Sequence, residues 1–142
     1  MVIGLARQED ILVCGGIYSA AFSMPPYREY WSPSDAAEML GELLRKDAES
    51  CWCAEDQGRV VGFAFCTTFG RFRGVIQEFA VDPEFQKQGI GTTLLAYVLD
   101  RMEERGIRTA DLVVNRDAPA YRLYRRFGFT PPGKYVLLVK WL

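Results

Sequence analysis

The sequence predicts an α/β (α+β) fold, with a mixed, mostly antiparallel sheet flanked by helices and one domain over residues 1–142. Three observations support this prediction. The chain has 142 residues, of which 49% are hydrophobic and 25% charged, as expected for a globular domain with a buried core. Two apolar stretches flank Asp56-Gln57-Gly58, which is the pattern of a β-hairpin. A third, Val75 to Val81, precedes a glycine-bearing turn and a segment of helical periodicity.

The N-terminal part is predicted to be mainly helical. Residues Asp10 to Phe22 have helical spacing, although Gly15-Gly16 weakens the pattern and is expected to mark a bend. Ser32 is the expected N-cap of a second helix, with Pro33 in its first turn and Asp35 as the partner that completes the cap. The expected elements are a short strand (Val2 to Leu5), a helix (Asp10 to Phe22), a loop (Ser23 to Trp31) and a helix ending near Lys46.

The rest of the chain is predicted to build most of the sheet. Val75 to Val81 is apolar almost throughout, which indicates a central strand covered on both faces. The next strand is expected to run parallel to it, because strand–helix–strand units close with a right-handed crossover. The expected elements are hairpin strands Cys51 to Glu55 and Arg59 to Phe69, strand Val75 to Val81, a helix ending at Arg105-Gly106, strand Ala110 to Val114, helix Ala118 to Phe127, turn Pro131-Pro132-Gly133 and a last strand from Tyr135 to Trp141.

Composition excludes several classes of function. The net charge of −1 provides no basic field for nucleic acid or an anionic membrane, and no apolar run reaches the roughly 20 residues of a membrane span. The first residues lack the pattern of a signal peptide, so a cytoplasmic location is expected. The chain has no histidine, which removes Ser-His-Asp, Cys-His and His-metal chemistry. The cysteines lie in apolar contexts without metal or redox spacing and are predicted to be structural thiols: Cys14, Cys51, Cys53 and Cys66.

The turn around Gly89-Ile90-Gly91 is the main functional signal. The first turn of a helix has unpaired N–H groups and the positive end of the dipole, and glycine lets an anion approach them. An ordinary strand-to-helix connection with incidental glycines is an open alternative. A P-loop does not fit, because Gly91 stands where lysine would precede Thr92. A dinucleotide fingerprint does not fit either, because its third glycine is missing.

Two blocks of sequence resemble one family. Gln86-x-x-Gly89-x-Gly91 resembles the [Q/R]-x-x-G-x-[G/A] signature of the GCN5-related N-acetyltransferases (GNAT), and the strand before it ends in the usual V-x-P. Downstream, the family's N-x-x-A…L-Y-x-x-x-G-F ending is matched by Asn115, Ala118, Leu123-Tyr124 and Gly128-Phe129. The resemblance implies a single GNAT-like N-acetyltransferase domain. It also implies transfer of an acetyl group from acetyl-CoA to a primary amine by direct attack in a ternary complex, without a metal.

The resemblance further implies a set of cofactor-binding residues. Strand amides near Phe79 and Val81 would hold the pantetheine arm and the developing oxyanion, and Asn115 would contact the same arm. The amides of Gln88 to Thr92 would hold the pyrophosphate. The complete expected set is Phe79, Ala80, Val81, Gln86, Lys87, Gln88, Gly89, Ile90, Gly91, Thr92 and Asn115.

Glu78 is a carboxylate within the most apolar strand. Strict alternation would place it on one face with Ile76 and Ala80, where burial is unfavourable without a partner or a function. From the residues alone two interpretations are open: an ion pair with Arg71 or Arg73, or a general base with a raised pKa. In the family a base glutamate often stands three residues before the V of V-x-P. Glu78 has that position, so the resemblance implies that it deprotonates the amine, through water.

Tyr124 also has two interpretations. Its spacing alone favours a helix aromatic packed on the sheet, whereas the resemblance implies a general acid that protonates the departing thiolate. The two expected catalytic residues are therefore Glu78 and Tyr124.

The acceptor site is expected between the Ser23 to Trp31 loop and the Phe69 to Arg73 connection. The expected partner is a small-molecule or peptide amine, with no nucleic acid and no membrane, and a homodimer is an open alternative. Two other functions are also open. One is a non-catalytic acetyl-CoA-binding sensor or interaction domain, and the other is an enzyme that acetylates a chain terminus or a lysine of a protein.

Overall fold

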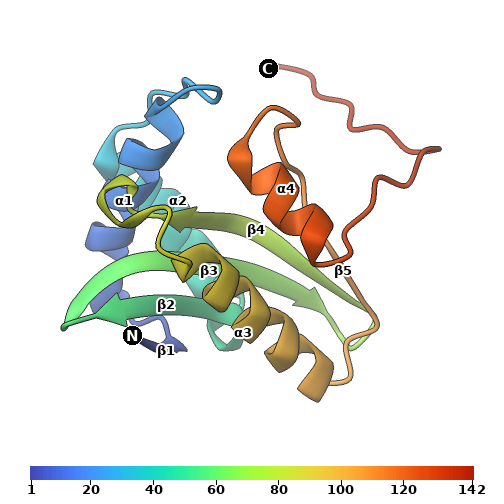
Figure 1. Cartoon of the computed structure of the whole chain (residues 1–142), viewed down its shortest axis with the longest axis horizontal. Helices are drawn as coiled ribbons and strands as arrows, with labels where there is room; N and C mark the ends of the chain where they lie inside the picture. Colours follow the sequence, from blue (N-terminus) through green and yellow to red (C-terminus); the bar gives the residue numbers. More distant parts are fainter.

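A five-stranded mixed sheet forms the centre of the structure, a computed structural model that describes residues 1–142 (Figure 1). The strand order is β1-β2-β3-β4-β5; neighbours are antiparallel except β4 and β5, which are parallel. The predicted mixed, mostly antiparallel sheet is therefore confirmed. Its strands are β1 (Val2–Leu5), β2 (Cys51–Asp56), β3 (Arg59–Phe69), β4 (Arg73–Val81) and β5 (Thr109–Asp111).

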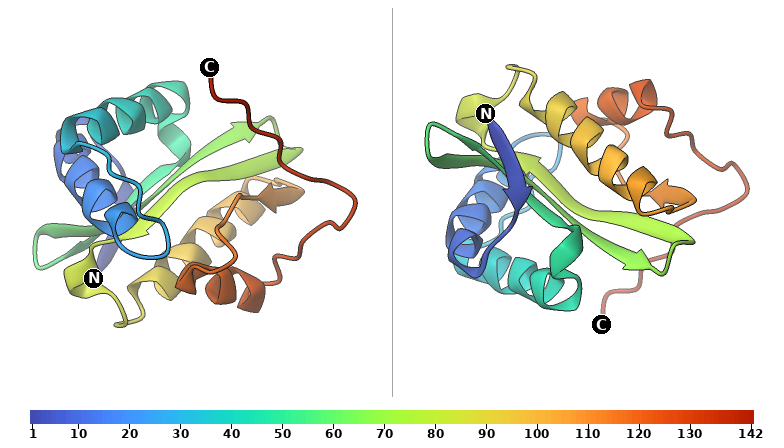
Figure 2. Two further views of the ribbon diagram at one scale, coloured as in Figure 1. Left: turned by 90° about the horizontal axis from the view of Figure 1, so that it is seen from above. Right: turned by 90° about the horizontal axis from the view of Figure 1, so that it is seen from below.

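Helices cover both faces of this sheet. Helices α1 and α2 lie on one face, and α3 and α4 lie on the other (Figure 2). Each face has its own core: one includes Phe63 and Leu40, the other Leu94 and Val98. No helix combines the length and the apolar composition that a membrane crossing requires. The helices are α1 (Ile11–Ser23), α2 (Pro33–Lys46), α3 (Ile90–Glu104) and α4 (Pro119–Arg126), with 3-10 turns η1 (Gln8–Asp10), η2 (Ala48–Ser50) and η3 (Pro83–Phe85).

Local signals account for several element boundaries. Ser32 Oγ accepts a hydrogen bond from the Asp35 amide at 3.1 Å, so α2 starts at the predicted cap. Gln57 and Gly58 both have positive φ, 51° and 77°, as a two-residue turn between hairpin strands requires.

One glycine of the α1 pair serves helix packing. The expected bend is wrong, because α1 continues through Gly15 and Gly16. Gly15 is buried against the start of α2. A Cβ on it would lie 2.6 Å from the Pro33 carbonyl oxygen and 2.9 Å from the Ala37 Cβ. A Cβ on Gly16 would meet nothing within 4 Å. Only Gly15 is therefore needed for the close approach of the two helices.

This difference predicts opposite effects for two alanine substitutions. Gly15→Ala should lower the free energy of unfolding by about 1–3 kcal/mol, because the added methyl overpacks the contact with α2. Gly16→Ala should raise it by about 0.5–1 kcal/mol, because alanine favours the helix and has room. Urea denaturation of wild type and both variants measures these changes in the free energy of unfolding. Equal effects of the two substitutions would show that the helix contact does not depend on Gly15.

The predicted last strand, from Tyr135 to Trp141, is wrong. The segment has no sheet partner and runs away from the body of the protein (Figure 1). Leu138 is 86% and Trp141 91% exposed. The physical reason lies in β5, which ends at Asp111 rather than at the predicted Val114 and offers only a three-residue edge. Apolar composition gives strand propensity, but a strand also needs a ladder partner.

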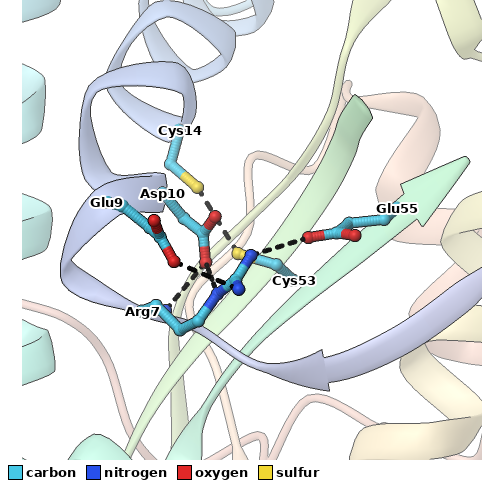
Figure 3. A network of polar contacts seen from close by, with 6 residues as sticks. All are labelled: Arg7, Glu9, Asp10, Cys14, Cys53 and Glu55. Carbon is cyan, nitrogen blue, oxygen red and sulfur yellow. Dashed lines mark hydrogen bonds and ion pairs between the residues drawn. The ribbon is translucent and has the colours of Figure 1, made fainter. Parts of the chain in front are cut away.

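The four cysteines are buried and unpaired, which confirms the prediction of structural thiols. Cys14 Sγ of α1 lies 3.6 Å from Cys53 Sγ of β2 (Figure 3). Beside this contact Arg7 pairs with Glu9 at 3.1 Å, with Asp10 at 3.5 Å and with Glu55 at 3.3 Å. The hydrogen bond with Cys14, together with burial, raises the pKa of the Cys53 thiol. This thiol therefore stays protonated and packs as a small apolar group.

Candidate active site

A β-bulge in β4 sets the direction of Glu78. Phe65 of β3 stands opposite Glu78, but the next residue of β3 stands opposite Ile76, so Gln77 is an extra residue in the ladder. Glu78 and Ala80 consequently face α1 and α2, whereas Ile76 packs in the core below α3. The predicted shared face of Glu78 and Ala80 is confirmed. That of Glu78 and Ile76 is wrong, because the prediction assumed an unbroken alternation.

Glu78 forms no ion pair, so its interpretation as the partner of a nearby arginine is wrong. Arg73 instead binds Asp111 of β5 through two hydrogen bonds, at 2.6 and 2.9 Å. Tyr18, on α1, lines the same cavity as Glu78. Burial raises the pKa of Glu78 to about 7; the Tyr18 hydroxyl opposes this shift and the negative charge of Glu29 adds to it. Glu78 therefore changes charge near neutral pH.

The raised pKa has a consequence for stability. The folded-state pKa of about 7 lies above the ordinary value of 4.5, so the folded protein holds this proton more tightly than the unfolded chain. The stabilising contribution of the Glu78 proton is then lost as the pH rises from 4.5, the ordinary pKa, through about 7, the pKa in the folded protein. The side chain at this position in the Glu78→Gln variant cannot ionise. As the pH rises from about 5 to about 8, the free energy of unfolding of the variant should therefore increase by about 2 kcal/mol relative to that of wild type.

Chemical denaturation of both proteins at these two pH values measures the difference. A difference in unfolding free energy that does not change with pH would show that Glu78 titrates normally in the folded state.

The edge of β4 beyond Val75 has unpaired backbone groups. β5 pairs only with the first residues of β4, Arg73 to Val75. The Asp82 amide donates to the Val61 carbonyl of β3 at 2.8 Å, and N–H direction alternates along a strand. The N–H groups of Phe79 and Val81 therefore point away from β3, toward the side that β5 has left. Gln86 Nε2 donates to the Val81 carbonyl on that same side at 3.0 Å.

The glycine turn places a helix start beside this edge. α3 begins at Ile90, after Gly89 at φ 84°, and its first turn has neither a side-chain cap nor an acidic residue. The amides of Ile90, Gly91 and Thr92 are thus free to bind an anion. A Cβ on Gly91 would lie 3.7 Å from Val81 and 3.5 Å from Leu123 of α4. The turn, the β4 edge and α4 therefore meet at one place.

Most of the expected cofactor-binding residues come together there, with one exception. Ala80 faces the core below α1 with its N–H toward β3, so it offers no free donor at the edge. Lys87 and Gln88 are exposed in the turn, with Lys87 at φ 65°. Asn115 accepts a hydrogen bond from the Asp117 amide at 2.9 Å, so its side chain shapes a turn and also lines the neighbouring cavity.

A cavity of about 320 Å³ brings Glu78 and Tyr124 together. Tyr124 is 6% exposed, and its ring packs at 6.0 Å from Phe79 and at 5.8 Å from Phe129. Burial raises the pKa of the Tyr124 phenol, so it remains a neutral proton donor. The lining residues are Tyr18, Phe22, Tyr27, Glu29, Ile76, Gln77, Glu78, Phe79, Leu112, Val113, Val114, Asn115, Ala120 and Tyr124.

A second cavity, of about 1280 Å³, lies between β5, α4 and the C-terminal segment. It contains Tyr124 but neither Glu78 nor the glycine turn. The smaller cavity is lined by both Glu78 and Tyr124, so it is the candidate active site.

One of the two segments expected to frame the acceptor site does so. Tyr27 and Glu29, from the Ser23 to Trp31 loop, line the cavity. The connection from Phe69 to Arg73 does not, because it lies at the opposite end of β4, about 17 Å of extended strand from Glu78. Tyr18 lies in the Asp10 to Phe22 segment, which was expected only to be helical. No local signal marks it, because its partner is distant in sequence and reached only through the fold.

Together, the strand edge, the helix start and the cavity provide unpaired backbone N–H groups beside a chamber with ionisable side chains. The chain belongs to the Acetyltransferase (GNAT) family, whose sequence profile matches residues 18–129. The mycothiol acetyltransferase of Acidimicrobium ferrooxidans is 35% identical over 120 residues, which cover 77% of this chain and 39% of that protein. The chain thus spans about two fifths of the length of the mycothiol acetyltransferases it matches.

Solved structures have the same fold. PH1933 from Pyrococcus horikoshii is 26% identical with a TM-score of 0.80, covering 95% of this chain and 92% of that one. The ribosomal-protein-S18-alanine N-acetyltransferase from Escherichia coli is 26% identical with a TM-score of 0.72, covering 91% of this chain and 77% of that one.

Proposed function

We propose that this protein is an acetyl-CoA-dependent N-acetyltransferase that moves the acetyl group to a primary amine by direct attack in a ternary complex. The observation that carries the proposal is the meeting of Glu78 and Tyr124 in one cavity beside the free edge of β4. Membership of the Acetyltransferase (GNAT) family and relatives named as acetyltransferases support it.

Acetyl-CoA binding is assigned to the strand edge and the helix start. The free N–H groups of Phe79 and Val81 suit the amide-bearing pantetheine arm and the thioester carbonyl. The amides of the first turn of α3 suit the pyrophosphate. Gln86 acts indirectly, because its side chain binds the Val81 carbonyl and fastens the turn to the end of β4.

Proton transfer is assigned to the two residues of the cavity. An alkyl amine has a pKa of about 10.4 and is mostly protonated at neutral pH, so it must lose a proton before it attacks. Glu78, with its pKa of about 7, is ionised above neutrality and takes this proton, directly or through water. Tyr124 is neutral and donates its proton to the departing thiolate. Alignment of amine and thioester supplies much of the remaining acceleration.

A non-catalytic acetyl-CoA sensor is the main alternative. It requires the glycine turn and the strand edge, but it gives no reason for a buried carboxyl and a buried phenol in the same cavity. We also propose a cytoplasmic location. The four buried cysteines form no disulfide, which favours a reducing compartment.

The role of Tyr124 is testable with a control on the same helix. Tyr124→Phe should lower kcat at least tenfold while acetyl-CoA affinity barely changes, because only the hydroxyl is lost and the ring still packs. Tyr121→Phe should leave kcat unchanged, because the Tyr121 hydroxyl accepts a hydrogen bond from Arg125 outside the candidate active site. Release of free thiol with an amine panel, together with calorimetric titration of acetyl-CoA, measures both quantities. Equal kcat in the two variants would remove Tyr124 from the mechanism.

A further inference from the structure

The candidate active site has an uneven charge distribution. Of the 14 residues that line it, only Glu29 and Glu78 carry a charge at neutral pH, and neither lysine nor arginine is among them. Glu78 is assigned above to the proton of the reacting amine. The second carboxylate, on Glu29, has no part in that chemistry.

Glu29 is held in place by the loop that carries it. Its amide donates to the Phe22 carbonyl at 2.8 Å, and the Arg28 amide donates to the Met24 carbonyl at 3.1 Å. The ring of Tyr27 packs edge-on against Phe22 with centroids 4.7 Å apart. The Glu29 carboxylate takes part in none of the ion pairs of the structure and is exposed at the cavity. The backbone of Glu29 is thus fixed, and its carboxylate has no protein partner.

Aromatic side chains line the same cavity as the two carboxylates. Tyr18 packs at 4.5 Å from Phe22, and both line the cavity together with Tyr27. Aromatic faces attract cations, and a carboxylate binds an ammonium or guanidinium group through charge-assisted hydrogen bonds. At about 320 Å³ the cavity lies at the lower end of the range for ligand sites, which suits a slender aliphatic chain.

We infer that the acceptor is a small aliphatic diamine, whose reacting amine lies at Glu78 and whose second, cationic end binds Glu29 among the aromatic walls. The inference rests on the proposed acetyl transfer and narrows its substrate class. In the reaction the acetyl C–S bond breaks and a C–N bond forms. The ammonium loses one proton to Glu78 before the attack. Tyr124 protonates the departing thiolate, the second proton lost by the nitrogen restores the Tyr124 phenol, and the products are an N-acetyl diamine, the free thiol and the proton that Glu78 then releases to solvent.

Three acceptors of equal chain length test the inference: an α,ω-diamine, the monoamine with a methyl end, and the ω-amino acid with a carboxylate end. With chains of three to six carbons, wild type should show the highest kcat/KM for a diamine, at least tenfold above its monoamine, and the lowest for the amino acid. In Glu29→Gln the ratio of kcat/KM for the diamine to kcat/KM for the monoamine should fall about tenfold. In Glu29→Lys the kcat/KM for the ω-amino acid should become higher than that for the diamine.

Glu38→Gln is the matched control. Glu38 is an exposed carboxylate on α2 outside the cavity, so its removal changes the net charge equally and should leave the ratio unchanged. Acetyl transfer to monoamines and diamines alike, or an equal fall in the ratio in Glu38→Gln, would overturn the inference and leave the proposed function standing. Transfer to no amine of any length would overturn the proposed function, and the inference with it.

Discussion

The site depends on one irregularity in β4, the extra residue Gln77. Because of this bulge, the strand presents its side chains to different faces before and after it. Without it, Glu78 would share the face of Ile76, which packs below α3, and would lose contact with Tyr18. The bulge thus brings a carboxyl into the α1 side of an apolar sheet, where burial raises its pKa to about 7.

The shortness of β5 is the second feature on which the site depends. Since β5 ends opposite Val75, the rest of β4 keeps free N–H groups at Phe79 and Val81 beside the start of α3. One strand therefore supplies an ionisable side chain on one face and backbone donors along its edge. The loop after α1 closes the same cavity with Tyr27 and Glu29, so both sides of the sheet contribute to one chamber.

Much of the fold could be predicted from the sequence, because its signals are local. The cap at Ser32, the Gln57-Gly58 turn and the glycine turn each depend on neighbouring residues, and all three occur as expected. The bulge, the Tyr18–Glu78 contact and the placement of the Phe69 to Arg73 connection depend on pairing between distant segments. Periodicity does not report such pairing. The predicted strand from Tyr135 to Trp141 failed for the same reason, since its composition said nothing about the length of β5.

The central claim is that the bulge makes Glu78 the base of acetyl transfer. The pH dependence of kcat/KM for wild type and Glu78→Gln, on the best amine found, tests it most directly. Wild-type activity should rise as the pH passes through about 7, as Glu78 ionises. The variant should be depressed near neutral pH and recover partly at higher pH, where more amine is already deprotonated. Superimposable profiles would contradict the claim and leave catalysis to positioning alone.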